Sequence, residues 1–513
     1  MILAAMLFIP VCGGVIAWLT EYVSAKLPRW ISLISLTIDF LLTAGLWLGF
    51  LHQPGAHGPW LASASAPWLL LPGVSFHLAV DGMSLVLVSL TAFLGCMAAA
   101  VSWNEITERT GFFHLCLSWT IAGVLGVFLS LDLFLFYFAW EFMLVPMYFL
   151  INCWGHEDRF RAAVKFFLFT QLSGLLMLAS IIGLYFANGR ATGVYTFDYE
   201  ALLHTPVTGP VALSLLLGFL AAFLVKLPAV PFHTWLPDAH TQAPTAGSVI
   251  LAGLLLKTGA YGLLRFAIPL FPAESSAAAA PLMVLGVVGV LYGALLAFSQ
   301  DDVKRLIAYT SVSHMGFVLL GLFAGSGLAF QGVMIQIVSH GLSTGALFIL
   351  AGLLQERLHT RSLSRMGGLW PVAPRLGGAS MFFALASLGL PGMGNFVGEF
   401  MIVLGVYPAH PVLAVAASLG FVFSTAYALR MIQRICFGEN KEGWKVPDLS
   451  LREMGIMALM MVPLLWLGLS PQPFIDRVEK GNPSVRETAA GPHTGSPSSP
   501  HPAGDPLPPG RRK

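Results

Sequence analysis

Apolar stretches long enough to cross a membrane alternate with short polar connections along most of the chain. A spanning helix needs about 17–25 predominantly apolar residues, and about fourteen segments meet that length. The seventh, eleventh and twelfth are expected to be interrupted rather than continuous. The expected bounds are 2–20, 29–51, 80–102, 112–130, 132–153, 160–187, 210–235, 243–268, 279–299, 304–324, 328–356, 376–407, 410–437 and 453–470.

Composition supports an all-α polytopic membrane protein. Hydrophobic residues make up 56% of the chain and charged residues 10%, whereas a soluble domain carries about 25% charged residues. No basic patch suggests nucleic acid as a partner. The five cysteines are scattered and form no metal-binding spacing, so we expect them to pack as small apolar residues and expect no metal site. The first stretch lacks the basic segment of a signal peptide and is interpreted as a spanning helix.

Lysine and arginine cluster on one set of connections, while the opposite loops carry only Arg190 and Arg265. Cytoplasmic loops are rich in these residues, so the clustered side is predicted to be cytoplasmic. An even number of spans then places both termini in the periplasm of a Gram-negative bacterium. The clustered residues are Lys26, Arg29, Arg109, Arg159, Arg161, Lys165, Lys304, Arg305, Arg357, Arg361, Arg365, Arg375, Arg430, Arg434, Lys441, Lys445 and Arg452.

The strongest functional signal is Lys226, which ends an apolar run two residues before Pro228. A charge in hydrocarbon costs at least about 2.5–3.5 kcal/mol on insertion scales, and such residues usually serve function. No counter-charge lies on its own helix face, so Glu141 in another apolar run is the expected partner. Burial disfavours the charged forms and pairing favours them, so this pair can switch. The alternatives are a snorkelling lysine and a structural ion pair that holds helices together.

Other ionisable residues lie in apolar surroundings. Lys257 is about ten residues into its span, which makes snorkelling difficult. His314 and His340 lie in adjacent spans with Ser and Thr neighbours, and histidine titrates near neutral pH; the alternative is a pair of hydrogen-bonded core histidines. Glu399 follows a helix break at Pro391, where a desolvated carboxyl group favours binding a proton. Each is interpreted as a proton-transfer residue.

Four further polar residues carry weaker signals. Asp39 lies in the second span, where it has no evident partner, and is interpreted as a possible packing residue. His233, Asp238 and His240 follow the break after Lys226 and are expected in a solvent-accessible loop on the cytoplasmic side; the alternative is a role at the mouth of a cavity.

Two features recur in the chain halves: a broken helix with an ionisable group, and a preceding span with a titratable residue. Such repetition is typical of inverted-repeat transporters. The expected organisation is three N-terminal helices in 1–111, five-helix repeats in 112–268 and 279–437, a final helix in 438–475, and a disordered tail in 476–513, where Pro, Gly and Ser dominate. We expect no cofactor in this chain.

Several long segments resemble the antiporter-like membrane subunits of respiratory complex I, the NADH:quinone oxidoreductase, and within them the M-type branch. They are FLVKLPAVPFHTWLPDAHTQAPTAGSVILAGLLLKTGAYGLLRF, DDVKRLIAYTSVSHMGFV and GLPGMGNFVGEF. The resemblance runs from the first helix to about residue 475. Glu105, in SWNEITER, also matches a family acid and is interpreted as interfacial. The Pro-rich tail and Asp39 depart from the family pattern.

The resemblance implies roles for the buried charges. Glu141 and Lys226 match the family's ion pair, Lys257, His314 and His340 its relay, and Glu399 its exit group. It further implies proton translocation in a bacterial inner membrane beside the L- and N-type subunits, with NADH, FMN, iron–sulfur clusters and quinone bound by other subunits. A multisubunit cation/proton antiporter or membrane-bound hydrogenase subunit is the alternative, and an inert membrane spacer is a third.

Overall fold

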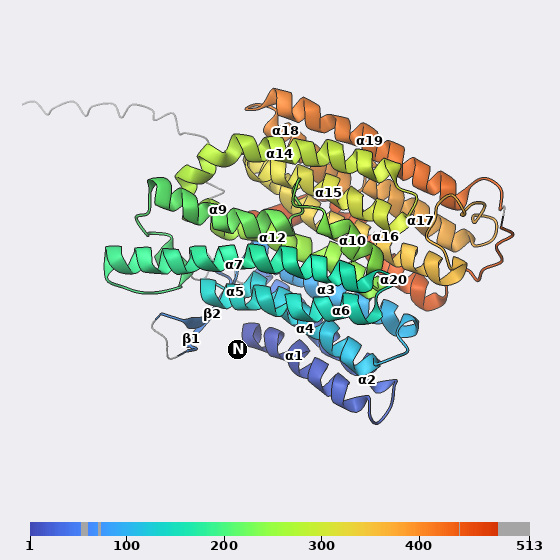
Figure 1. The fold of residues 1–513 in the computed structure, drawn as a ribbon, viewed down its shortest axis with the longest axis horizontal. Helices are drawn as coiled ribbons and strands as arrows, with labels where there is room; N and C mark the ends of the chain where they lie inside the picture. The colour runs from blue at the N-terminus through green and yellow to red at the C-terminus, as the bar shows by residue number, and fades with distance from the viewer. Residues whose placement is uncertain (53–59, 70–72, 441, 481–513) are drawn as a thin grey trace, which may run out of the picture.

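The computed structural model describes residues 1–52, 60–69, 73–440 and 442–480 as a bundle of helices that run mostly along its long axis (Figure 1). The first half contains α1 (Ile2–Thr20), α2 (Leu27–His52), α3 (Gly82–Glu105), α4 (Thr110–Leu129), α5 (Leu133–Phe142), α6 (Leu144–Trp154), α7 (Arg159–Thr192), α8 (Tyr199–Leu202), α9 (Gly209–Lys226) and α10 (Trp235–Gln242). The second half contains α11 (Thr245–Ile250), the π-helical turn η1 (Leu251–Leu255), α12 (Leu256–Gly262), a second π-helical turn η2 (Leu263–Ala267), α13 (Ile268–Leu270), α14 (Pro272–Ser299), α15 (Val303–Leu322), α16 (Gly327–Leu358), α17 (Pro374–Ser387), α18 (Gly394–Val406), α19 (Pro411–Cys436), α20 (Leu451–Leu469) and α21 (Gln472–Lys480).

The all-α membrane architecture is confirmed. Thirteen helical segments in the described part of the chain are long and apolar enough to cross a membrane. The shorter helices α17 and α18 together occupy the remaining expected span, at 376–407, with a break between them. The seventh span is likewise interrupted after Lys226, because Pro228 and Pro231 lack the backbone N–H that a continuing helix needs.

One expected interruption is wrong, and two are new. The eleventh span is the continuous helix α16, because the small and hydroxyl residues around His340 leave its backbone hydrogen bonds intact. The fifth span breaks at Met143 between α5 and α6, three residues before Pro146. The eighth contains the π-helical turns η1 and η2, which flank α12 and its residue Lys257. No proline or glycine pattern in the sequence indicated these turns.

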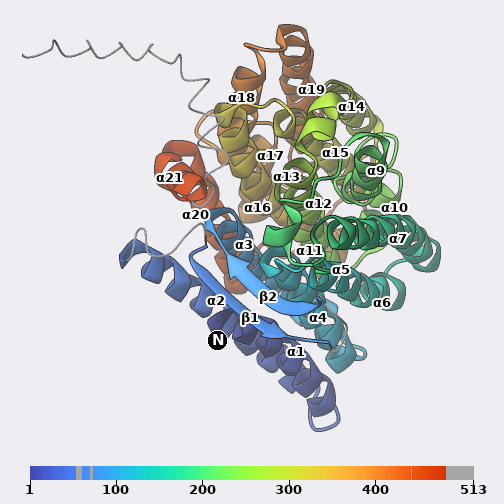
Figure 2. The ribbon, with the colours of Figure 1, turned by 90° about the vertical axis from the view of Figure 1, so that its left-hand side faces the viewer.

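The hairpin of β1 (Ala62–Pro67) and β2 (Ser75–Val80) was not expected. Its strands are antiparallel, with Ala62 opposite Val80 and Pro67 opposite Ser75. Figure 2 views the bundle from the end that this hairpin covers. We call this the hairpin end. The opposite end, where the connections containing Arg109, Arg159 and Arg361 lie, we call the basic end.

Aspartates start several helices and join them to the hairpin. Asp132 caps α5 by accepting from the backbone N–H groups of Phe134 and Leu135, and its other oxygen accepts from Ser75 in β2. Asp81 caps α3 by accepting from the Ser84 N–H and pairs with the buried Arg265 guanidinium. Because each carboxylate satisfies helix N–H groups and a second element together, the hairpin end is tied at several points.

The C-terminal helix α21 packs against α3 at the hairpin end. It covers Gln472–Lys480, so the first residues of the expected 476–513 tail are helical. The rest of that tail, 481–513, lies outside the described residues.

A salt bridge outside the membrane spans yields a pH prediction. His77 Nδ1 lies 2.6 Å from Asp198 Oδ2. The hydrogen bond raises the pKa of His77 above its ordinary 6.5, although burial of the imidazole acts in the opposite direction. Burial of Asp198 acts to raise its pKa, but the same hydrogen bond acts against burial, and that pKa lies below 3.8. By linkage, the stabilisation from His77 is fully present below about pH 6.5 and is lost as the pH rises through the raised pKa of His77. The stabilisation from Asp198 is lost at the acid side, as the pH falls through the lowered pKa of Asp198.

We expect hydrogen exchange at the His77 imidazole C2, followed by mass spectrometry, to titrate above pH 6.5. Asp198→Asn should bring the midpoint down, because the charged acceptor is removed. His204, in the exposed turn after α8, serves as an internal reference in the same protein. An unchanged midpoint in the variant would contradict the pairing.

Candidate proton-transfer site

Glu399, on α18, is the most completely surrounded of the predicted residues. Its Oε1 lies 2.5 Å from His314 Nδ1 on α15 and accepts from Gln336 Nε2 on α16 at 2.7 Å. The three side chains are buried, and Glu399 Oε2 has no partner among the described residues. The imidazole and the carboxyl group are therefore in direct hydrogen-bond contact.

Close helix packing brings these groups together. A Cβ on Gly332 of α16 would lie 2.7 Å from the Gly398 carbonyl oxygen, and one on Gly398 of α18 would lie 2.7 Å from the Gln336 nitrogen. Neither position has room for a side chain, so the two backbones touch, as small residues allow in membrane bundles. This contact places Gln336 beside the residue that follows Gly398, which is Glu399.

Lys257 and His340 form the next linked pair. Lys257 Nζ lies 2.6 Å from His340 Nδ1 on α16 and donates to the Ala252 carbonyl oxygen in η1. Both side chains are 0% exposed. An ammonium group has three donors, and two of them are used here. π-helical turns occur frequently at functional sites, and this one supplies an acceptor for a lysine on the helix that follows it.

The rings of His340 and His314 meet edge to face, with 5.5 Å between their centroids. His340 Nε2 has no hydrogen-bond partner in the described chain, whereas His314 Nε2 contacts the Ser387 and Tyr427 hydroxyls at 3.3 and 3.4 Å. Lys257, His340, His314 and Glu399 therefore form one contiguous series across α12, α16, α15 and α18. We call these four residues the central file.

Buried polar groups beside the central file lack partners as well. On α16 they are Ser339, Ser343 and Thr344, and on α18 Asn395. Buried polar atoms are rarely left unsatisfied, and internal water commonly completes their hydrogen bonds. This concentration on two helices that contact each other favours a hydrated interior around the central file.

Glu141 and Lys226 face each other more loosely. Lys226 is 1% exposed, its Nζ has no hydrogen-bond partner in the described chain, and it lies 5.2 Å from the Trp140 ring centroid. Its charge interacts with that of Glu141, but the two do not form an ion pair within 4.0 Å in the described structure. Glu141 in turn lies against Gly174 of α7, where a Cβ would contact its Oε1 atom.

Backbone contact, not a hydrogen bond, connects this pair to the central file. A Cβ on Gly259 of α12 would lie 2.7 Å from the Phe223 carbonyl oxygen and 2.8 Å from the Leu227 nitrogen. The end of α9, which carries Lys226, therefore packs directly on the helix that carries Lys257. The structure thus brings four of the six predicted residues into one file and leaves Glu141 and Lys226 as a neighbouring pair.

One expectation about the α9–α10 region is wrong. His233, Asp238 and His240 were expected in a solvent-accessible loop, but His240 is 0% exposed and His233 is 5% exposed. The segment re-enters the bundle as the short helix α10, and only Asp238 is partly exposed, paired with Lys165 at 2.6 Å. His240 stacks on Phe348 with 4.4 Å between centroids, and neither of its ring nitrogens has a partner in the described residues.

Two further residues were missed or undervalued. Lys304, at the start of α15, was assigned to the cytoplasmic loops but is 0% exposed and donates to the Ala243 carbonyl oxygen. Glu105, interpreted as interfacial, accepts from Thr245 and interacts with the charge of Lys304.

Asp39 is buried in α2 with neither oxygen paired in the described chain, and nothing in the structure explains it. The described residues contain no group of three or more His, Cys, Asp or Glu able to hold a metal.

Comparison with known proteins places this arrangement in a family. Residues 130–424 match the family model described as NADH:quinone oxidoreductase/Mrp antiporter, transmembrane. The chain belongs to this family. It is 53% identical over 486 residues to NADH-quinone oxidoreductase subunit M of Pseudomonas aeruginosa, covering 93% of this chain and 96% of the relative. It is 52% identical over 487 residues to subunit M of Escherichia coli K12, with the same coverage.

Solved structures of this antiporter-like family share the fold. A chain of respiratory complex I from Thermus thermophilus aligns with a TM-score of 0.86 and 34% identity, covering 95% of this chain and 100% of that chain. A chain of the Mrp complex from Dietzia sp. aligns with a TM-score of 0.81 over 95% and 99% of the two chains. At 19% identity, the second likeness shows the fold alone.

The pairing of buried charges predicts opposite effects on stability. Lys226→Met should leave the thermal unfolding temperature of the detergent-purified chain unchanged or raised, because it removes a buried ammonium group without a hydrogen-bond partner. Arg265→Met should lower the unfolding free energy by about 3–5 kcal/mol, because it leaves Asp81 buried without its partner. Differential scanning fluorimetry measures both. A comparable loss of stability in Lys226→Met would identify Lys226 as a structural ion-pair member.

Proposed function

We propose that this chain translocates protons across a bacterial inner membrane as the M-type subunit of an NADH:quinone oxidoreductase. The central file supports this function most directly, because it joins four titratable groups, all buried, by short hydrogen bonds and one ring contact. The identity of more than half the aligned residues with two M subunits supports the assignment to this enzyme. NADH, FMN, iron–sulfur clusters and quinone are bound by other subunits of the assembly.

The Glu141–Lys226 pair acts as the electrostatic control. Its separation is large enough to exclude an ion pair of 4.0 Å, and the lysine has no hydrogen bond that holds it in place. A charge change in a neighbouring subunit shifts the equilibrium between an arrangement in which Glu141 and Lys226 form an ion pair and one in which they are apart. Because opposite charges stabilise each other's ionised forms, opening the pair releases a proton from Lys226 toward Lys257, across the contact between α9 and α12.

The central file carries the proton onward. Lys257 donates to His340 Nδ1, and the imidazole releases a proton from its unpartnered Nε2. The rings of His340 and His314 are in contact, and the unpartnered hydroxyls of Ser339 and Ser343 on the helix of His340 can hold water for this step. His314 then passes its proton to Glu399, whose Oε2 has no partner in the described chain and is the proposed point of release. Histidine suits these central positions because its two ring nitrogens allow it to accept a proton on one side and donate one on the other.

Orientation and partners follow from charge and family. The basic end faces the cytoplasm, and the hairpin end, where the first described helix begins, faces the periplasm. The chain begins and ends its spans at the hairpin end, in keeping with an even number of crossings. The neighbouring subunits in the lipid bilayer are the antiporter-like L- and N-type chains.

A multisubunit cation/proton antiporter is the second candidate function. Its support is the family description and the fold shared with the Mrp complex. The much higher identity to M subunits favours the oxidoreductase. An inert spacer is disfavoured because it would have no use for several ionisable groups buried without partners.

The switch role of Lys226 predicts the result of Lys226→Ala. In membrane vesicles, proton pumping driven by NADH should fall by more than tenfold, because a proton-transfer residue typically contributes about 10²–10⁴-fold. NADH:ferricyanide activity and migration on native gels report assembly. Thr120→Val, which removes a buried α4 hydroxyl bonded to its own helix, is the control and should pump normally. Undiminished pumping with intact assembly in Lys226→Ala would refute its role.

The position of Glu141 yields a second prediction. Gly174→Val should displace the Glu141 carboxylate, because a Cβ at residue 174 contacts Oε1, and pumping should fall several-fold with assembly retained. Gly455→Val in α20 is the matched control, since a Cβ there meets no atom within 4 Å. Equal pumping in the two variants would show that the Glu141 position does not matter.

A further inference from the structure

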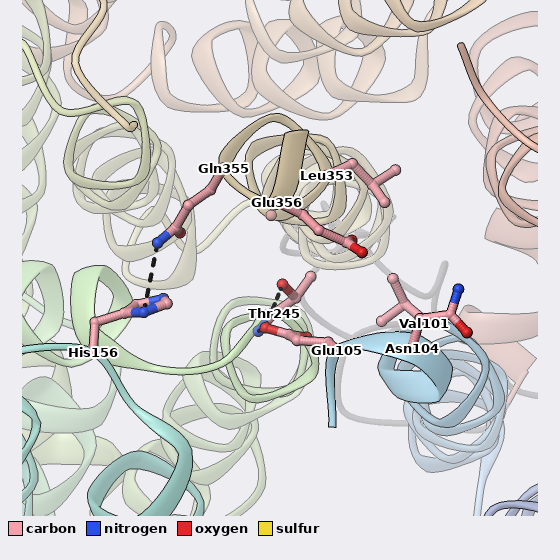
Figure 3. Close-up of a pocket in the computed structure, with 9 residues that line it drawn as sticks. Val101, Asn104, Glu105, His156, Thr245, Leu353, Gln355 and Glu356 are labelled. Atoms are coloured by element: carbon pink, nitrogen blue, oxygen red, sulfur yellow. Dashed lines mark hydrogen bonds between the residues drawn. The ribbon is translucent and has the colours of Figure 1, made fainter. Parts of the chain in front are cut away.

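A water-accessible cavity at the basic end borders buried titratable groups outside the central file. It has a volume of ≈ 310 Å³ and lies where α3, the α6–α7 connection, α11 and α16 meet (Figure 3). Asn104 and Glu356 are exposed on its rim, and Glu105, His156 and Thr245 form its inner wall. The cavity therefore leads from the surface to an acid and an imidazole inside the bundle.

Lys304 lies directly behind this wall. Its Nζ lies 3.4 Å from His156 Nε2, donates to the Ala243 carbonyl oxygen at 3.2 Å and interacts with the charge of Glu105. Glu105 Oε2 has no partner in the described structure. Burial and the charges of Lys304 and Arg361 lower the pKa of His156, which lies outside the spans, to about 4. His156 is consequently neutral and able to accept a hydrogen bond from the lysine.

His240 is close enough to both Lys304 and Lys257 for their charges to act on its imidazole. Ala243, which Lys304 contacts, follows the end of the helix that carries His240. The charges of both Lys257 and Lys304 act on the His240 imidazole, and His240 acts on His340. Its two ring nitrogens are buried without partners in the described residues. Leaving a buried polar atom unpaired costs about 1–3 kcal/mol, so both nitrogens favour water.

We propose that this cavity is the vestibule where protons are collected from the basic-end solution, and that Glu105, Lys304 and His240 pass them to Lys257. The Glu105 carboxyl group exchanges protons with the solution in the cavity. Lys304, behind the wall, receives the proton, and His240 transfers it to Lys257. This inference rests on the proposed function, because it extends the central file to the surface. It assigns a proton-relay role to Lys304 and His240, which are not among the six proton-transfer residues predicted from the sequence.

Arginine at residue 304 separates relay from structure. Lys304→Arg keeps the positive charge and hydrogen-bond donors toward Glu105 and Ala243, but a guanidinium group does not release its proton near neutral pH. In vesicles with the whole complex, we expect Lys304→Arg and His240→Gln to lower NADH-driven pumping by roughly tenfold or more. Lys165→Arg, at the exposed pair with Asp238, should pump normally. Wild-type pumping in Lys304→Arg would overturn the inference.

Two additional measurements keep the outcomes distinct. Lys257→Arg is assayed beside these variants. Normal pumping in Lys257→Arg would contradict the proposed function. Normal pumping in the residue 304 and 240 variants, with a loss in Lys257→Arg, would overturn the vestibule and leave the proposed function standing. If Lys304→Arg does not assemble, Asn104→Cys at the cavity rim decides. Blocking it with a bulky, membrane-impermeant thiol reagent should lower pumping several-fold relative to wild type treated identically. Unchanged pumping after complete labelling would overturn the inference.

Discussion

The structure depends on holding ammonium groups in an interior that disfavours charge. Lys257 is fully buried, and its ammonium group is stabilised by one imidazole nitrogen and one carbonyl oxygen rather than by a carboxylate. Neither partner carries a full negative charge. Burial opposes the charge of such a lysine, and the two acceptors support it. A carboxylate partner would bind the proton too firmly to release it.

The buried charges of this chain fall into two groups that differ in how they are paired. Arg265 with Asp81 and Arg357 with Glu453 are closed ion pairs near the bundle ends. Removing one member of such a pair leaves a buried charge without compensation, so these pairs stabilise the fold. Four of the proposed proton-transfer residues keep one atom without a partner in the described chain, and a proton or water can enter there: Glu141 Oε1, Lys226 Nζ, His340 Nε2 and Glu399 Oε2.

Much of the fold and four residues of the central file could be predicted from the sequence. Apolar stretches of spanning length predict the helices because hydrocarbon allows few other backbone arrangements. Lys257, His314, His340 and Glu399 stood out because ionisable groups are costly at that depth. The hydrogen bond from Gln336 to Glu399 was not predictable, since it depends on the Gly332–Gly398 contact between helices far apart in the sequence. Nor were the π turn that serves Lys257 or the hairpin, which leave no distinct local pattern.

His240 and Lys304 show why position along the chain misleads in a membrane bundle. Both lie near the ends of apolar stretches, where a basic residue normally indicates the water interface. The break after Lys226 changes this, because it returns the chain to the bundle as α10 and buries His240 against Phe348. Lys304 is then covered by the end of that helix through Ala243. One interrupted span therefore ends a helix at the buried Lys226 and also encloses a second lysine, Lys304, behind the end of α10.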